Sequence, residues 1–156
     1  MSEIDLQASE YRAAAQLRAG LRHFLQTSAQ VLQAHGLTPE RYELLLAIKG
    51  AADGSERATV GEVTAALGLA HSSATQLARR AEDAGLLRRE VSAHDARVRY
   101  LRLTDAGERQ LAGAVAELHR ERERLAEVVA RLPSTAHRSR PRRGRGSKRP
   151  PARRST

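Results

Sequence analysis

The side chains with the clearest chemical potential lie on a predicted helix that begins at Ser72 or Ser73. One face of this helix, at about 100° per residue, collects short hydroxyls, an amide and a guanidinium: Ser72, Thr75, Gln76 and Arg79. The opposite face is mostly alanine, which favours close packing against neighbouring elements. Side chains of the first set can reach phosphates and base edges in a DNA major groove. The alternative interpretation is a plain solvated helix surface.

A predicted β-hairpin rich in arginine follows this helix, and it weakens that alternative. Residues 86–91 (LLRREV) and 98–103 (VRYLRL) have the character of two short strands, and the polar, turn-prone sequence SAHDAR lies between them. The hairpin arginines are Arg88, Arg89, Arg97, Arg99 and Arg102. An arginine at a hairpin tip, beside a helix that fits a groove, is suited to probing a minor groove or phosphates.

A shorter helix is predicted just before the polar one. Thr59 and Glu62 form a T-x-x-E capping box at its start. An apolar stripe follows at Val60, Val63, Ala66 and Leu67. Gly68 stands where this helix must end, and Ser73 with Gln76 offers a second capping box. The order of helix, tight turn, helix and hairpin over residues 59–104 is that of a winged helix-turn-helix.

Longer helical segments flank this unit on both sides. From about residue 9 to residue 35 an apolar stripe repeats at helical spacing, and Thr38-Pro39-Glu40 then opens a mostly buried helix. Residues 105–132 carry an apolar seam at alternating spacings of four and three, with Arg122 as its one charged member. We expect two chains to pair through these segments. The alternative is an amphipathic helix that folds back on its own domain.

With these residues in this order, the chain resembles the MarR family of winged helix-turn-helix transcription factors. The family's wing signature is D-x-R, five further residues, and L-T; Asp95, Arg97, Leu103 and Thr104 match it. The resemblance extends over roughly residues 17–132 and includes GLTPERYELLLAIKG and DAGERQL. It implies a mainly α fold with a small β-wing (α+β) and long N- and C-terminal dimerisation helices. A short third strand near residues 51–57 is often present in the family.

The resemblance also implies a function. It describes a homodimeric, sequence-specific regulator, a repressor rather than an activator, that binds a pseudo-palindromic operator in double-stranded DNA. Arg97 would enter the minor groove, and Asp95 would brace Arg97 and the wing. The full set predicted to contact DNA is Ser72, Ser73, Thr75, Gln76, Arg79, Arg80, Arg88, Arg97 and Arg99. A small aromatic or anionic ligand would release the DNA from a pocket predicted at Arg18, Phe24 and Tyr42.

The net charge of +9 resides in the C-terminal segment. Residues 133–156 contain nine Lys and Arg and no acid, which leaves 18 basic and 18 acidic residues in residues 1–132. We therefore predict one folded domain (residues 1–132) and a disordered basic tail (residues 133–156) in place of the family's final helix. The tail supports a competing hypothesis, a non-specific architectural nucleic-acid binder. A winged helix that binds protein is a third hypothesis, and the arginine-rich hairpin disfavours it.

Several other functional classes find no support in the sequence. The six histidines are scattered over different predicted elements and the chain has no cysteine, so we predict no enzyme, no metal site, no cofactor and no disulfide. No apolar run approaches the length of a membrane span, and the N-terminus has no signal-peptide pattern. We expect a soluble, cytoplasmic protein with no membrane partner.

Overall fold

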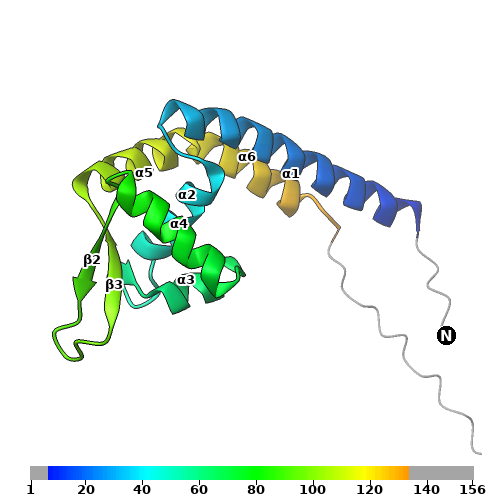
Figure 1. Cartoon of the computed structure of the whole chain (residues 1–156). Coiled ribbons are helices and arrows are strands. Elements are labelled where there is room, and N and C mark those ends of the chain that lie inside the picture. The colour runs from blue at the N-terminus through cyan, green and yellow to red at the C-terminus, as the bar shows by residue number, and fades with distance from the viewer. Residues whose placement is uncertain (1–6, 134–156) are drawn as a thin grey trace, which may run out of the picture.

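The fold of residues 7–133, which the computed structural model describes, is mainly helical with a small sheet, as predicted (Figure 1). Its elements in chain order are α1 (Ala8–Ala34), α2 (Pro39–Lys49), β1 (Arg57–Ala58), α3 (Val60–Leu67), α4 (His71–Asp83), β2 (Leu87–Val91), β3 (Arg99–Leu103), α5 (Asp105–Glu117) and α6 (His119–Ala130). The predicted basic tail, apart from Pro133, lies outside the described residues. Within residues 7–133, no helix is both long and apolar enough to span a membrane.

The sheet has the strand order β1-β3-β2, and both pairings are antiparallel. Leu87 pairs with Leu103 across β2 and β3, and Arg57 pairs with Arg102 across β1 and β3. The two long strands each begin one residue later than predicted and end where predicted. The short strand that the family resemblance placed near residues 51–57 is also present, as β1. We call β2, β3 and the turn between them the wing, which projects from one side of the domain (Figure 1).

The turn between α3 and α4 is tighter than the sequence suggested. The Thr59–Glu62 capping box forms as predicted, with Glu62 Oε2 accepting from the Thr59 amide at 2.6 Å. Gly68 ends α3 in the left-handed conformation, at φ 64°. The extended residue Ala70 then caps α4 without a side-chain hydrogen bond, so α4 begins at His71. The second capping box, predicted at Ser73 and Gln76, is therefore wrong, because the two-residue turn starts the helix before either serine.

The hydrophobic core lies where α2, α4 and the base of the wing meet. Leu44, Leu45 and Ile48 of α2 are fully buried. The predicted inner face of α4 is buried at Ala74, Leu77, Ala78 and Ala81. Its fifth predicted member, Ala84, is exposed because it caps the end of the helix. Burying four of these side chains fixes the opposite face of α4 toward solvent, and that face carries the predicted contact residues.

The C-terminal segment departs from the single seam that the sequence suggested. It forms two helices separated at the buried Leu118, and α6 lies beside α1 of the same chain (Figure 1). The two helices approach closely at Gly20, where an added Cβ would come within 3.1 Å of Val128 Cγ1. The bend keeps Leu118 in the core while it directs α6 along α1. The sixth helix, which the sequence led us to consider replaced by the tail, is therefore present.

Candidate nucleic-acid interface

The outward face of α4 carries every contact residue predicted on this helix. Ser72, Ser73, Thr75, Gln76, Arg79 and Arg80 are all exposed. The Thr75 hydroxyl donates to the His71 carbonyl at 2.8 Å, so its oxygen remains available as an acceptor. Within residues 7–133 neither Arg79 nor Arg80 forms an ion pair, and α4 has no acidic residue before Glu82. This face can therefore offer hydroxyls, an amide and two unneutralised guanidinium groups to an anionic partner.

The exposed His71, at the first position of α4, belongs to the same surface. The sequence analysis missed it because the helix was predicted to begin at Ser72 or Ser73. A signal for it was nevertheless present, since Gly68 in a left-handed cap leaves room for a turn of only two residues. His71 can donate a hydrogen bond from a ring nitrogen beside the unpaired amides of the first helical turn.

The wing sheet sorts its arginines onto two faces. The register places five residues on the outer face of the wing, which is opposite α4: Arg57, Arg88, Glu90, Tyr100 and Arg102. The inner face carries Arg89 and Arg99 beyond the buried leucines, and Arg89 Nε donates to Glu82 Oε2 of α4 at 2.9 Å. Arg88 had been predicted to contact DNA with α4, but its side chain lies on the outer face, where it binds Glu90.

At the wing tip, the guanidinium of Arg97 is exposed and makes no ion pair within the described residues. Its backbone amide donates to Asp95 Oδ1 at 2.9 Å, and the Val98 amide donates to the Asp95 carbonyl at 3.0 Å. Asp95 therefore holds the turn through the Arg97 backbone rather than through the Arg97 side chain. This arrangement fixes the Cα of Arg97 and leaves its side chain able to reach outward.

A pocket of about 390 Å³ lies between α1, α2 and α6. Phe24 and Tyr42 line it, as predicted for a ligand site, but Arg18 does not; the arginine in its wall is Arg122 of α6. Ser28, also in the wall, is only 7% exposed, and its hydroxyl has no hydrogen-bond partner among the described residues. The pocket thus combines apolar and aromatic walls with one cation and one unsatisfied hydroxyl.

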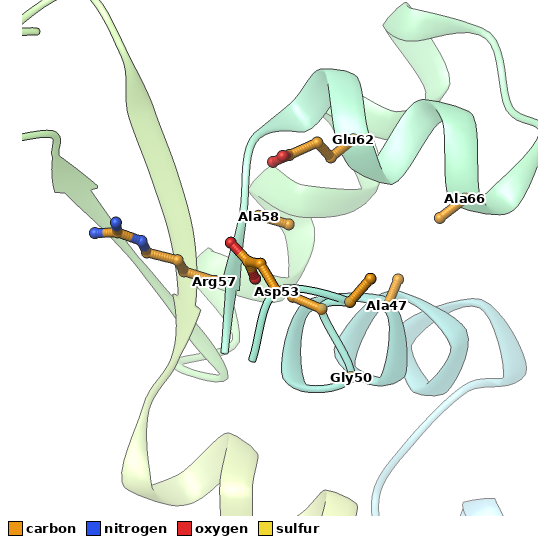
Figure 2. A pocket seen from close by; sticks show the side chains of 9 residues that line it. Ala47, Gly50, Asp53, Arg57, Ala58, Glu62 and Ala66 are labelled. Atoms are coloured by element: carbon orange, nitrogen blue, oxygen red, sulfur yellow. The ribbon is translucent and has the colours of Figure 1, made fainter. Parts of the chain in front are cut away.

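A second pocket, of about 440 Å³, lies between α2, β1 and α3 (Figure 2). Its wall is largely alanine, and its carboxylates are already occupied: Asp53 accepts from the Ser55 amide at 2.9 Å, and Glu62 serves the capping box. Arg57 points away toward the wing and stacks on the Tyr100 ring at 4.1 Å. Its charged groups are therefore committed to the fold, and we assign it no ligand.

Comparison with known proteins places this geometry among transcription regulators. A family model described as MarR family matches residues 35–98. A MarR family protein from Bacillus stearothermophilus is 27% identical, with 80% of this chain and 84% of that chain covered and a TM-score of 0.60. AbsC, a MarR family transcriptional regulator from Streptomyces coelicolor, is 23% identical, with coverages of 83% and 84% and a TM-score of 0.61.

One further structure, a MepR mutant from S. aureus, is bound to an oligodeoxyribonucleotide. It is 21% identical, with 78% of this chain and 84% of that chain covered and a TM-score of 0.60. A search of curated protein sequences gives no significant match.

Proposed function

We propose that this chain, which belongs to the MarR family of winged helix-turn-helix transcriptional regulators, binds operator DNA through α4 and the wing tip as a homodimeric repressor. Members of this family are transcription regulators rather than enzymes, in agreement with the sequence analysis. The observation that carries the proposal is the outward face of α4. It presents exposed polar and basic side chains without an acid, although residues 1–132 contain as many acidic as basic residues. An ordinary solvated surface mixes charges of both signs.

The division of labour follows from the geometry of the two parts. Gln76 and Arg79 project from a helix of a size that fits the major groove, where amide and guanidinium groups distinguish base edges. Arg97 extends from the wing tip toward the adjacent minor groove or phosphates. The DNA-bound MepR mutant, which has the same fold, supports this mode of binding.

Pairing of two chains is the second part of the proposal. Although α6 covers part of α1, apolar side chains remain exposed along these helices: Tyr11, Leu21, Leu25 and Val129. Their burial in a two-fold interface would remove this surface from water. Two copies of α4 would then lie about 34 Å apart, one turn of DNA, and would read the two halves of a pseudo-palindrome.

Selection of bound duplexes from a random DNA pool tests this function directly. With full-length protein at physiological salt, we expect enrichment of one sequence with two-fold symmetry. Recovery of an unbiased pool would instead support the non-specific architectural binder, because phosphate contacts alone carry no sequence information. The enriched duplex, here called the selected duplex, then serves as the specific probe in the experiments below.

Arg97→Ala should weaken binding to the selected duplex by roughly 1–3 kcal/mol, the value of a good arginine contact. The fold should be unaffected because Arg97 is exposed and its role in the turn uses only its backbone amide. Titration of labelled duplex measures the loss. Arg120→Ala, at an exposed position on α6, is the control with the same charge change. Wild-type affinity in a folded Arg97→Ala protein would contradict the assignment of the wing tip to DNA.

Release of the DNA by a small aromatic or anionic ligand is the third part of the proposal. The pocket between α1, α2 and α6 has the size of a small-molecule site and the polar groups to orient a carboxylate on a ring. Arg122 supplies a cation for the carboxylate, and Phe24 and Tyr42 supply ring contacts. The buried, unpartnered Ser28 hydroxyl gains a hydrogen bond only if something else enters.

Benzoate is a suitable first probe for this pocket. We expect it to bind and to weaken the complex with the selected duplex, and Arg122→Gln should reduce its affinity roughly tenfold, as expected for loss of a charge-assisted hydrogen bond. Arg18→Gln is the matched control, because Arg18 lies on α1 outside the pocket wall. Calorimetry measures benzoate binding to the protein alone. Equal affinities for the two variants would contradict the assignment of Arg122.

A further inference from the structure

The outer face of the wing gathers three guanidinium groups around a single carboxylate. Glu90 lies opposite Tyr100 in the sheet, and Arg88 lies opposite Arg102, which in turn lies opposite Arg57 of β1. All five side chains therefore project from the same side of the sheet. They are partly exposed or exposed, and they face away from the core and from α4.

Glu90 contacts two of these arginines with separate oxygens. Arg88 donates to Glu90 Oε1 from Nε at 3.1 Å and from Nη2 at 2.8 Å. Arg102 Nε lies 3.3 Å from Glu90 Oε2, at ion-pair distance but without the alignment of a hydrogen bond. Arg102 also donates from Nη2 to the Ser55 carbonyl at 3.2 Å. The hydrogen bond from Arg88, followed by the nearby positive charges, holds the pKa of Glu90 below its ordinary value, so the carboxylate is charged at neutral pH.

The arginines of the wing thus fall into two groups. Arg88 and Arg102 are held by Glu90, and Arg89 is held by Glu82 of α4. Arg97 and Arg99 have no acidic partner within residues 7–133. The unpaired arginines lie at the tip and on the inner face, the side shared with α4. The arginines on the side away from α4 are partly neutralised.

We propose that Glu90 is a specificity-determining positioning residue that keeps Arg88 and Arg102 off the DNA backbone. A guanidinium that swings to a phosphate adds affinity through counterion release but reads no base. Two such groups on a wing would favour every sequence alike and would dilute the contribution of α4. By holding both, Glu90 leaves binding dependent on the tip and on the outward face of α4. This inference rests on the proposed DNA-binding function.

Glu90→Gln tests the inference through a gain rather than a loss. The variant should bind a scrambled duplex more tightly than wild-type protein does. The slope of log affinity against log salt should steepen by about 0.9 for each freed guanidinium that reaches a phosphate, and so by up to about 1.8. The preference for the selected duplex over the scrambled one should fall about threefold or more, since one extra phosphate contact changes affinity by roughly that factor over a fourfold range of salt.

Two further variants separate this role from a purely structural one. Glu127→Gln removes an equally charged carboxylate that pairs with Arg131 on α6, far along the chain from the wing, and it should leave the salt slope on the scrambled duplex unchanged. Adding Arg88→Gln to Glu90→Gln should return part of the wild-type slope, because it removes one freed cation. Damage to the sheet would instead weaken binding to both duplexes, and the double variant would not reverse that loss.

The outcomes are distinguishable from a failure of the proposed function. If wild-type protein prefers the selected duplex but Glu90→Gln leaves slope and preference unchanged, the role of Glu90 is overturned while the proposed function stands. If Glu90→Gln weakens binding to both duplexes equally, Glu90 supports the wing structurally and does not set specificity. If wild-type protein shows no preference for any duplex, the proposed function fails, and the inference fails with it.

Discussion

Gly107→Ala should destabilise the folded protein by about 3 kcal/mol, at the upper end of the cost of overpacking a core. Gly107 is buried in the first turn of α5, and an added Cβ would overlap the carbonyl oxygen of Leu86 and lie 3.1 Å from its carbonyl carbon. The obstacle is backbone, which cannot rotate away as a long side chain can. A loss of this size is a large part of the total stability of a small domain, which is about 5–15 kcal/mol.

Two hydrogen bonds keep the Leu86 backbone from yielding. The Thr104 amide donates to the Leu86 carbonyl at 3.0 Å, and the Thr104 hydroxyl donates to the Gly85 carbonyl at 2.6 Å. The Thr104 hydroxyl oxygen also accepts from the Gly107 amide at 3.2 Å, as the cap of α5. The start of α5 is thereby tied to the junction between α4 and β2. A side chain at residue 107 would force these segments apart, so we expect a cooperative loss of stability rather than a local adjustment.

Gly61→Ala is the matched control for this substitution. Gly61 lies in α3, where an added Cβ would meet only Thr59 Oγ1 at 3.8 Å. Alanine in a helix is favoured over glycine by up to about 1 kcal/mol, so this variant should be as stable as wild type or slightly more stable. Urea unfolding followed by circular dichroism measures both changes. A Gly107→Ala midpoint equal to that of wild type would show that α5 does not dock against Leu86 as described.

Local signals in the sequence were sufficient for most element boundaries. The Thr59–Glu62 box and Gly68 bracket α3 within ten residues, because a cap acts only on the turn beside it. The inner face of α4 followed from helical periodicity, and the strands of the wing from their composition and the polar turn between them. The start of α4 was misplaced because Ala70 caps it through backbone conformation alone. No side chain marked that position.

The composition of the sites depended more on tertiary structure. The outward face of α4 was predictable, since its own buried residues define it. The orientation of Arg88 was predictable in principle, because Leu87 faces the core and alternation then turns Arg88 to the other face of the sheet. The exchange of Arg18 for Arg122 in the pocket was not, since it depends on the bend at Leu118 that brings α6 along α1. That contact joins segments roughly 100 residues apart.

Deletion of residues 133–156 should give the largest change in DNA binding, and the change should fall on affinity rather than on sequence preference. These residues carry nine Lys and Arg and no acid. Each positive charge that neutralises a phosphate contributes about 0.9 to the slope of log affinity against log salt, so full engagement of the tail would contribute about 8. We expect a smaller loss of slope than this, since not every charge will meet a phosphate. Even three lost contacts would lower affinity by roughly fortyfold over a fourfold range of salt.

The preferred sequence should survive the deletion because the residues proposed to read bases all precede residue 133. Binding to the selected and scrambled duplexes, measured from low to high salt with full-length and truncated protein, separates the two effects. A full-length variant with all nine Lys and Arg changed to Gln is the matched control, and it should behave like the truncated protein if charge is the cause. Identical slopes for all three proteins would show that the tail makes no contact with DNA. Loss of discrimination between the two duplexes on truncation would show that the tail reads the sequence, and the role proposed for α4 and Arg97 would then be wrong.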